Sequence, residues 1–186
     1  MAGSAPSNAR DTVRRDAVLE SALLTFARHG YRKTAMEEVA RTARISRPGL
    51  YFLFESKEAL FRAAVTRALE RDLAAAEQLL ADTGRPLRRR LVAAFDQWAG
   101  RYVGALSRDV VGVINQNPDL LGPIVETAPR HFEELVTDAI AEASGRASAL
   151  RVAQTLISTS IGLKHQVDTR EKYLARLTVA VDLLVG

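Results

Sequence analysis

Residues 34–61, TAMEEVARTARISRPGLYFLFESKEALF, constrain the fold more than any other part of this 186-residue chain. Thr34 and Glu37 have the T-x-x-E spacing of a capping box, in which each side chain satisfies a backbone NH at a helix start. This spacing predicts a helix that begins near Ala35. Ser46 is a favoured N-cap residue and predicts a second helix after a short turn. The stretch is therefore expected to form two short helices joined by a tight turn.

The second of these helices is expected to have one buried face and one exposed face. Leu50 and Phe54 are four residues apart, so they lie on the same side of a helix and suit a core. Arg47, Tyr51 and Phe52 are then left on the outside. Two interpretations fit this pattern: a small three-helix core whose basic residues are simply solvated, or a helix-turn-helix whose second helix enters the major groove of DNA.

This stretch, together with the residues just before it, resembles the DNA-binding segment of the TetR family of bacterial repressors, in order and without gaps. The matching positions are Phe26, Gly30, Tyr31, Thr34, Val39, Ala40, Ile45, Ser46, Arg47, Leu50, Tyr51, Phe54 and the run from Ser56 to Phe61. Three positions depart from the family pattern. Arg44 replaces the usual turn glycine, Gly49 a frequent Thr, Ala or Ser, and Leu53 a frequent His or Tyr. The departures affect contacts with DNA rather than the three-helix fold that the resemblance implies.

Eight residues are expected to face DNA, most of them at positions that match the family. These are Thr34, Arg44, Ser46, Arg47, Gly49, Tyr51, Phe52 and Lys57. Arg47 is the member of this set that can read a guanine through two hydrogen bonds. Tyr51 and Lys57 match family positions that grip phosphates, so they are expected to supply affinity without sequence preference. Arg44 is expected to add a phosphate contact peculiar to this chain.

The remainder of the chain also has helical periodicity, so the predicted fold class is all-α. The resemblance implies an N-terminal three-helix helix-turn-helix domain followed by a C-terminal helical bundle that binds effector and dimerises. The expected boundaries are a disordered arm at 1–10, the DNA-binding domain at 11–56, and the effector-binding and dimerisation domain at 57–186. Arg10, Arg14 and Arg15 either reach phosphates or the minor groove, or are solvated.

Helices are predicted over residues 12–28, 35–43, 46–54, 56–80, 87–107, 110–114, 119–143, 148–165 and 169–185. A loop is expected at 115–118, and Pro129 is expected to kink or restart its helix because proline removes an internal hydrogen bond. Ser56 is expected to cap the long helix that follows it, and Gly145 to end the helix predicted at 119–143. The long helix belongs to both domains. It is therefore the natural element for transmitting a signal between them.

The last two predicted helices carry apolar stripes and further apolar residues beside them. Asp168 and Glu171 repeat the capping-box spacing at the start of the second helix. In TetR-family members the corresponding helices form a four-helix bundle with a second subunit, so the resemblance implies a homodimer. The residues expected at its interface are Leu156, Tyr173, Leu177, Val181 and Leu184. The alternative is that these apolar faces pack within one subunit.

The middle helices are the expected site of a small-molecule effector, whose identity the sequence does not give. Phe95, Trp98 and Tyr102 follow one another at helical spacing, and Asn115 and His131 are polar residues able to anchor a ligand. Stripes of this kind are more often core than pocket.

Composition argues against several other classes of protein. The chain has no cysteine, and its three histidines lack metal-ligand spacing. It has no glycine-rich phosphate loop either, so no enzyme, metal or cofactor is expected. No apolar run is long enough for a membrane span and no signal peptide is recognised, which favours a cytoplasmic protein without a membrane partner. The formal net charge is +4, with most of the excess in residues 1–61.

The sequence thus predicts a ligand-responsive regulator that binds double-stranded operator DNA and is, as most often in this family, a repressor. Two alternatives remain open. One is a helical ligand-binding protein, which would not bind DNA specifically. The other is an architectural DNA-binding protein, which no ligand would release.

Overall fold

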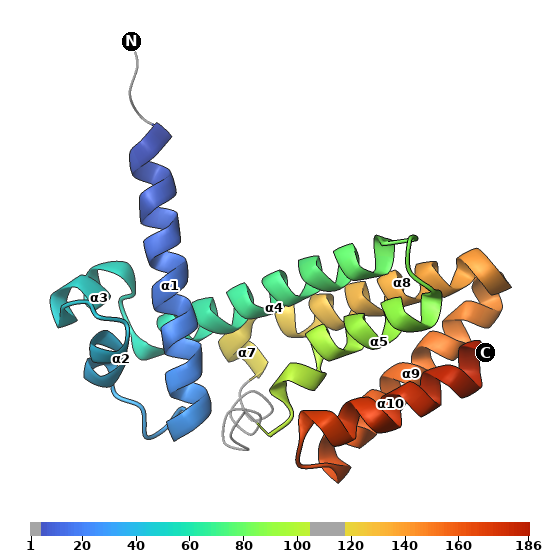
Figure 1. The fold of residues 1–186 in the computed structure, drawn as a ribbon. Coiled ribbons are helices and arrows are strands. Elements are labelled where there is room, and N and C mark those ends of the chain that lie inside the picture. Colours follow the sequence, from blue (N-terminus) through green and yellow to red (C-terminus); the bar gives the residue numbers. More distant parts are fainter. Residues whose placement is uncertain (1–4, 105–117) are drawn as a thin grey trace. The chain divides into compact units, whose positions relative to one another are not determined.

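The computed structural model describes residues 5–104 and 118–186, and every regular element in these ranges is a helix (Figure 1). The elements are α1 (Ala5–His29), α2 (Met36–Thr42), α3 (Arg47–Leu53), α4 (Lys57–Ala81), α5 (Leu87–Trp98), the 3-10 helix η1 (Gly100–Tyr102), α7 (Pro118–Leu121), α8 (Ile124–Ser144), α9 (Arg146–Gln166) and α10 (Arg170–Val185). The predicted all-α fold class is confirmed. Among these helices none is both long and apolar enough to cross a membrane.

The chain divides into two compact units. Their described parts are residues 5–68 with 118–122, and residues 69–104 with 123–186. α4 contributes to both, because the division falls after Ala68, in the middle of a helix that runs without interruption from Lys57 to Ala81.

An aromatic cluster at the centre of the first unit holds its helices together. The Phe26 ring of α1 meets the Phe61 ring of α4 edge to face, with 5.1 Å between centroids, and the Tyr31 ring lies 4.8 Å from that of Phe61. Val39 of α2 and Leu50 of α3 are fully buried, and α2 packs against both α1 and α3. Edge-to-face packing suits the ring quadrupoles and adds about 0.5–1.5 kcal/mol per pair to the burial of apolar area. The three amino-terminal helices therefore pack as one rigid platform.

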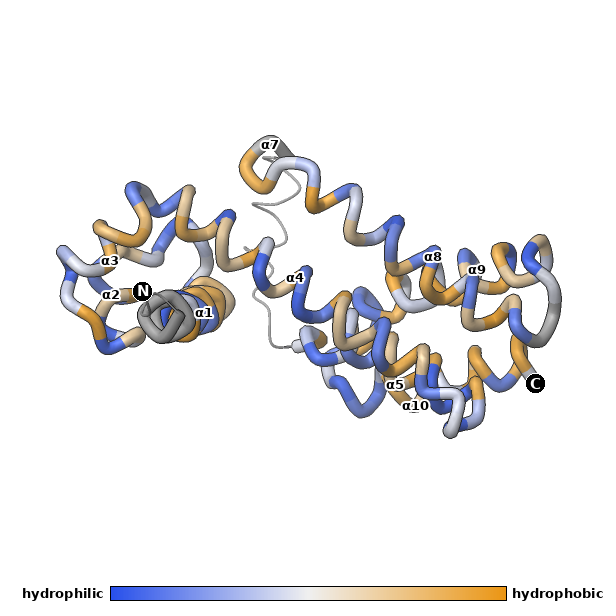
Figure 2. The backbone as a smooth tube through the Cα atoms, turned by 90° about the horizontal axis from the view of Figure 1, so that it is seen from above, coloured by the Kyte–Doolittle hydropathy of each residue, from blue (hydrophilic) through white to orange (hydrophobic). Residues whose placement is uncertain are grey.

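The second unit has a separate core built from the C-terminal half of α4 and from α5, α8, α9 and α10. α8 packs against α9, α9 against α10, and α10 against α5. Hydrophobic and hydrophilic stretches alternate along α4 and α8, as expected of helices with one buried face (Figure 2). Phe95 of α5 and Phe132 of α8 meet edge to face at 5.1 Å in this core.

Two of the predicted helix caps are present and two are not. Ser46 caps α3 and Ser56 caps α4, since their hydroxyls accept the backbone NH groups of Gly49 at 3.1 Å and Ala59 at 3.0 Å. The two predicted capping boxes are wrong. α2 has Ala35 as its N-cap with no side-chain hydrogen bond. α10 is capped by Thr169, one residue after the predicted Asp168.

Several helix boundaries differ from the predictions. α1 begins at Ala5, so residues 5–10 are helical rather than part of an arm. α5 ends at Trp98 instead of continuing to residue 107, because Ala99 leaves the helical conformation. α8 starts after Gly122 and Pro123 and continues through Pro129 without a restart. The predicted helix at 110–114 and loop from Asn115 lie outside the described residues.

Candidate functional site

α3 is a two-faced helix whose outer face carries the predicted DNA contacts. Ser46 and Pro48 fix its first turn, while Leu50 is fully buried. On the opposite face Tyr51 is 42% exposed and Phe52 is 90% exposed. A phenylalanine with almost its whole ring in water costs hydration free energy and does nothing for the core. This face therefore has the character of a contact surface.

Arg47 projects from the first turn of α3 and is held by two neighbours. Its terminal nitrogen donates to Glu37 Oε1 of α2 at 2.8 Å, and its guanidinium carbon lies 5.7 Å from the centroid of the Tyr51 ring. Gly49 lies between Arg47 and Tyr51 in the sequence. A Cβ there would come within 3.0 Å of Ser46 Oγ, so any larger residue would press on the cap of α3.

The turn between α2 and α3 contains a residue in the left-handed backbone conformation, which glycine adopts with the least strain. Arg44 has a φ angle of 55°, and among the described residues it is the only one other than glycine with a positive φ. The turn is closed by Ile45 N, which donates to Ala40 O at 3.0 Å. A left-handed residue with a side chain costs roughly 1–2 kcal/mol. The Arg44 side chain is exposed, as a phosphate contact requires.

Thr34 lies beneath the surface rather than on it. Its side chain is only 2% exposed, and its hydroxyl donates to Gly30 O at 2.7 Å. The hydroxyl is used to close the turn that follows α1, which is why it does not cap α2. The structure thus removes the Thr34 side chain from the candidate DNA surface.

The Lys57 ammonium is held by the loop between α1 and α2. Nζ donates to the carbonyl oxygens of Tyr31 at 3.2 Å, Thr34 at 3.4 Å and Arg32 at 3.5 Å, and lies 4.6 Å from the Tyr31 ring centroid. Beside it, Glu58 accepts the Tyr31 hydroxyl at 3.0 Å. A bond from its own backbone NH, and then the Tyr31 bond, lower the pKa of the Glu58 carboxyl. The first turn of α4 is thereby clamped to the loop, and Lys57 would have to break these bonds to reach a phosphate.

The arginines near the amino terminus have different surroundings. Arg15 donates to Leu53 O at 3.2 Å, and its guanidinium lies 4.3 Å from the Phe54 ring centroid. It thus binds the C-terminal end of α3, where a cation also complements the helix dipole. Arg14 is exposed, and the side chain of Arg10 lies outside the described residues.

The residues predicted to bind an effector have different surroundings. Phe95 is 1% exposed, and Trp98 stacks on Phe132 with 4.9 Å between centroids, so both are packed in or against the core. His131 lies on the exposed side of α8. Asn115 is outside the described residues. Phe132, which the sequence analysis missed, is part of a regular spacing in α8 that includes Ala128, Val136 and Ile140, all buried.

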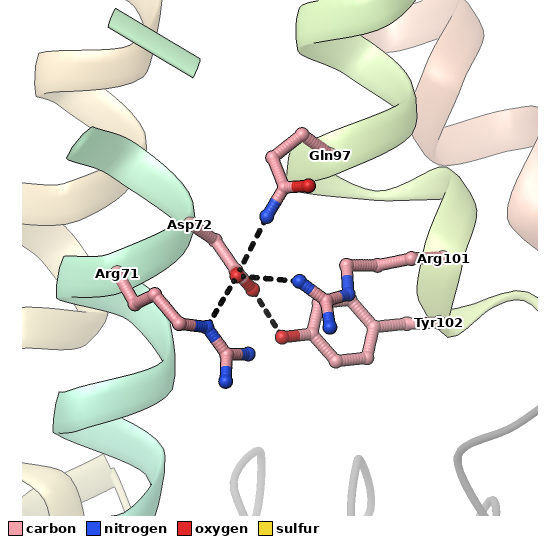
Figure 3. A network of polar contacts seen from close by, with 5 residues as sticks. All are labelled: Arg71, Asp72, Gln97, Arg101 and Tyr102. Carbon is pink, nitrogen blue, oxygen red and sulfur yellow. Dashed lines mark hydrogen bonds and ion pairs between the residues drawn. The ribbon is translucent and has the colours of Figure 1, made fainter. Parts of the chain in front are cut away.

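Tyr102 belongs to a polar network centred on a buried carboxylate that the sequence did not reveal (Figure 3). Asp72 of α4 is 1% exposed. Its Oδ1 accepts from Gln97 and Arg101 at 3.0 Å and from Arg71 at 3.2 Å, while Oδ2 accepts the Tyr102 hydroxyl. Burial, and then the bond to Asp72, raise the pKa of Tyr102 to about 12. The network ties α4 to α5 and to η1.

A groove of about 490 Å³ lies between α5 and α10, away from these residues. Val92 and Leu174 line it, and Asp96 lies at its edge, where Arg170 Nε donates to Oδ1 at 2.7 Å. None of the four predicted effector residues that the structure describes, Phe95, Trp98, Tyr102 and His131, lines this groove.

Four of the five residues predicted at a dimer interface are buried within the protomer. Leu156, Tyr173, Leu177 and Val181 are each 0% exposed and pack between α9, α10 and α5. The alternative that these stripes pack within one subunit is therefore correct for them. Leu184 is 38% exposed. The large apolar residues that α9 and α10 expose are Leu150, Ile161, Val179, Leu183 and Leu184.

Residues 18–64 match the family model described as bacterial regulatory proteins, tetR family. Over 57 residues the chain is 39% identical to the HTH-type transcriptional repressor ComR of Escherichia coli K12, covering 31% of this chain and 27% of ComR. Over 59 residues it is 36% identical to the HTH-type transcriptional regulator RutR of the same organism, covering 32% of this chain and 28% of RutR. The chain thus spans less than a third of the length of these curated relatives.

The similarity of fold extends much further. The crystal structure of reduced E. coli NemR superimposes with a TM-score of 0.75 and 19% identity, covering 94% of this chain and 97% of NemR. A TetR transcription regulator from Haloarcula marismortui gives a TM-score of 0.75 at 14% identity, covering the same shares. The chain thus resembles the TetR family of bacterial regulatory proteins in the sequence of its amino-terminal helices, and it has a TetR-like fold over nearly its whole length.

Proposed function

We propose that this protein is a homodimeric transcriptional repressor that binds double-stranded operator DNA through α3 and is released from it by a small molecule. Such a regulator acts on chromosomal DNA in the bacterial cytoplasm. TetR-type regulators are DNA-binding proteins rather than enzymes.

The exposed face of α3 is the observation that carries the DNA-binding part of the proposal. Arg47 can supply two parallel NH donors to a guanine, and Phe52 can contact a thymine methyl group in the major groove. Tyr51 is 42% exposed on this face, and its hydroxyl suits a phosphate oxygen. The tight Ser46 cap and the buried Leu50 hold these side chains on a rigid element, which recognition requires.

The test is binding to duplex DNA from the region flanking the protein's own gene, measured over a range of salt concentrations. Tyr51→Ala is expected to weaken binding to all duplexes and to lower the log-log salt slope by up to about 0.9. Arg47→Ala is expected to lose discrimination between sequences as well. Arg130→Ala is the matched control for charge, because Arg130 is a 75% exposed arginine of α8 in the other unit. Equal binding by all four proteins would refute the assignment of α3.

A second copy of the chain is the proposed partner of the exposed apolar residues on α9 and α10. Val179 and Leu183 are one turn apart on α10 and are 58% and 80% exposed, and Ile161 on α9 is 51% exposed. Burying such residues against a second subunit stabilises the pair by about 25 cal/mol per Å² of apolar area. Two half-sites on DNA also require a two-fold symmetric protein.

Two substitutions on α10 separate the interface from the core. Leu183→Glu is expected to give a folded monomer, because the side chain is exposed in the protomer. Leu177→Glu is expected to unfold the protein, because it buries a charge without a partner. Sedimentation and circular dichroism measure the two outcomes. An intact dimer for Leu183→Glu would place the interface elsewhere.

α4 supports the proposal of control by a ligand, since one continuous helix contributes to both compact units. A ligand that favours one position of α4 within the second unit would shift the first turn of the same helix, which is clamped to the DNA-binding platform through Lys57. Moving an operator from 99% occupied to 99% free requires about 5.5 kcal/mol of differential binding.

Trp98 provides the assay for this control, because it is the only tryptophan in the chain and stacks on Phe132 in the second unit. Small molecules are screened for release of bound DNA, and the tryptophan emission is recorded in the same titration. A releasing compound is expected to change that emission. Release with unchanged emission would move the ligand site away from Trp98, and no release by any compound would favour an architectural DNA-binding protein.

A further inference from the structure

Glu37 is an acidic residue of the first turn of α2, on the side of that helix next to the outer face of α3. Its carboxylate is 52% exposed and accepts from Arg47 at 2.8 Å. A carboxylate beside a phosphate backbone repels it, so Glu37 lowers the affinity for DNA of every sequence. The ion pair itself is exposed, and such pairs contribute little to folding. Both Glu37 and Glu38 lie in the first turn of α2, where a negative charge suits the helix dipole, but only Glu37 is bonded to Arg47, and the dipole does not explain that bond.

The geometry of Arg47 gives an explanation. An arginine that reads guanine must present two NH groups in one plane to the base edge. The same guanidinium binds phosphates equally well, and phosphates are far more numerous on any duplex. Glu37 holds Arg47 from the α2 side and the Tyr51 ring lies against it within α3. The bond to Glu37 engages one terminal nitrogen, and the guanidinium has five NH donors, so other donors remain for a base.

We propose that Glu37 is a specificity-determining residue that acts through Arg47. It holds the guanidinium over the base edges and keeps it from the phosphates. Its own charge weakens binding to every duplex, and only a guanine within reach of Arg47 offsets that loss. When DNA covers the pair and excludes water, the attraction between the two charges strengthens, so the restraint is greatest in the complex. This inference rests on the proposed DNA-binding function of α3.

Glu38 supplies a matched control one residue away. Its Oε1 lies 3.4 Å from His29 Nε2 and 3.9 Å from a terminal nitrogen of Arg41, and it has no contact with Arg47 among those found in the structure. Glu37→Gln and Glu38→Gln make the same change in charge on the same helix. Only the first removes the carboxylate that holds Arg47.

The experiment begins with wild-type protein and a pool of random-sequence duplex DNA, from which the preferred duplex is selected and sequenced. Affinities are then measured for that duplex, for single base-pair variants of it and for an unrelated duplex. Glu37→Gln is expected to bind the unrelated duplex more tightly and to lose roughly fivefold or more of the discrimination at one base pair. Arg47→Ala is expected to lose discrimination at the same base pair. Glu38→Gln is expected to keep it.

The double variant Glu37→Gln/Arg47→Ala tests whether Glu37 acts through Arg47. Its discrimination is expected to equal that of Arg47→Ala alone. A further loss in the double variant would show that Glu37 reads a base itself, and unchanged discrimination in Glu37→Gln would show that it does not position Arg47; either result overturns the inference. If wild-type protein binds no duplex at all, the proposed function fails, and this inference fails with it.

Discussion

Removing the charge of Asp72 is expected to destabilise the second unit more than any exposed ion pair does. The carboxylate is 1% exposed and accepts four hydrogen bonds from side chains of α4, α5 and η1. Asp72→Asn keeps the shape but offers one acceptor oxygen to those donors. Turned toward Tyr102, the amide NH2 group can donate to the hydroxyl oxygen, whereas turned the other way it faces the NH donors of the other three side chains. In both orientations the guanidinium groups of Arg71 and Arg101 lose their counter-charge.

The magnitude follows from the contacts. At 3.0 Å and an effective dielectric constant of about 20, the Coulomb attraction between Asp72 and Arg101 is about 5 kcal/mol. Removing one partner of a buried pair costs about 3–5 kcal/mol. The side chains of Arg71 and Arg101 are 35% exposed, so water compensates part of their loss. We therefore expect a decrease of about 2–3 kcal/mol in the free energy of unfolding, and a melting temperature lower by roughly 5–10 °C.

Urea unfolding followed by Trp98 emission measures this effect, because Trp98 lies in the same unit. Asp82→Asn is the control, since Asp82 is 45% exposed and pairs with Arg85 at 2.9 Å, and its loss is expected to cost less than about 1 kcal/mol. In the Asp72→Asn background, Arg101→Met is expected to cost less than in wild type. Equal stability of the Asp72 and Asp82 variants would refute the reasoning.

Three further predictions concern stability and DNA binding. Lys57→Met is expected to lower the free energy of unfolding by about 1–2 kcal/mol, because the ammonium binds the loop after α1. It is expected to leave the salt slope of DNA binding unchanged. A slope lowered by about 0.9 would instead show that Lys57 contacts a phosphate directly. Burial raises the pKa of Tyr173 to about 12 from 10.0, so as the pH rises from 10 to 12 the unfolded chain loses this proton before the folded protein does, and the free energy of unfolding falls. Tyr173→Phe is expected to reduce that fall in urea titrations. An unchanged fall would show that the raised pKa of Tyr173 is not its cause. Arg44 has a φ angle of 55°, which glycine adopts without strain and a β-branched residue does not. Arg44→Gly is therefore expected to raise the free energy of unfolding by up to about 1 kcal/mol, and Arg44→Val to lower it in the same assay. The opposite order would exclude a left-handed turn.

The sequence alone determined the all-α fold class and the local signals that begin and end several helices. Ser46 and Ser56 cap the helices they were expected to cap, and Gly145 ends α8 with φ of 77°. These predictions hold because a cap is satisfied by atoms within three or four residues of it. The same spacing rule failed at Thr34 and Asp168. The Thr34 hydroxyl donates to the Gly30 carbonyl instead of capping α2, and Thr169 rather than Asp168 caps α10. Local spacing does not show which of two such hydrogen bonds forms.

Only the tertiary structure decided what the faces of the helices meet. Leu177 and Leu183 are both apolar residues of α10, yet one is 0% exposed and the other 80% exposed, because α5 and α9 cover one side of the helix. Lys57 and Asp72 illustrate the same dependence for charged residues. Their partners lie between 23 and 30 residues away in the chain, apart from the adjacent Arg71. Hydrophobic periodicity shows that a face must be buried, but packing between distant segments selects the partner that buries it.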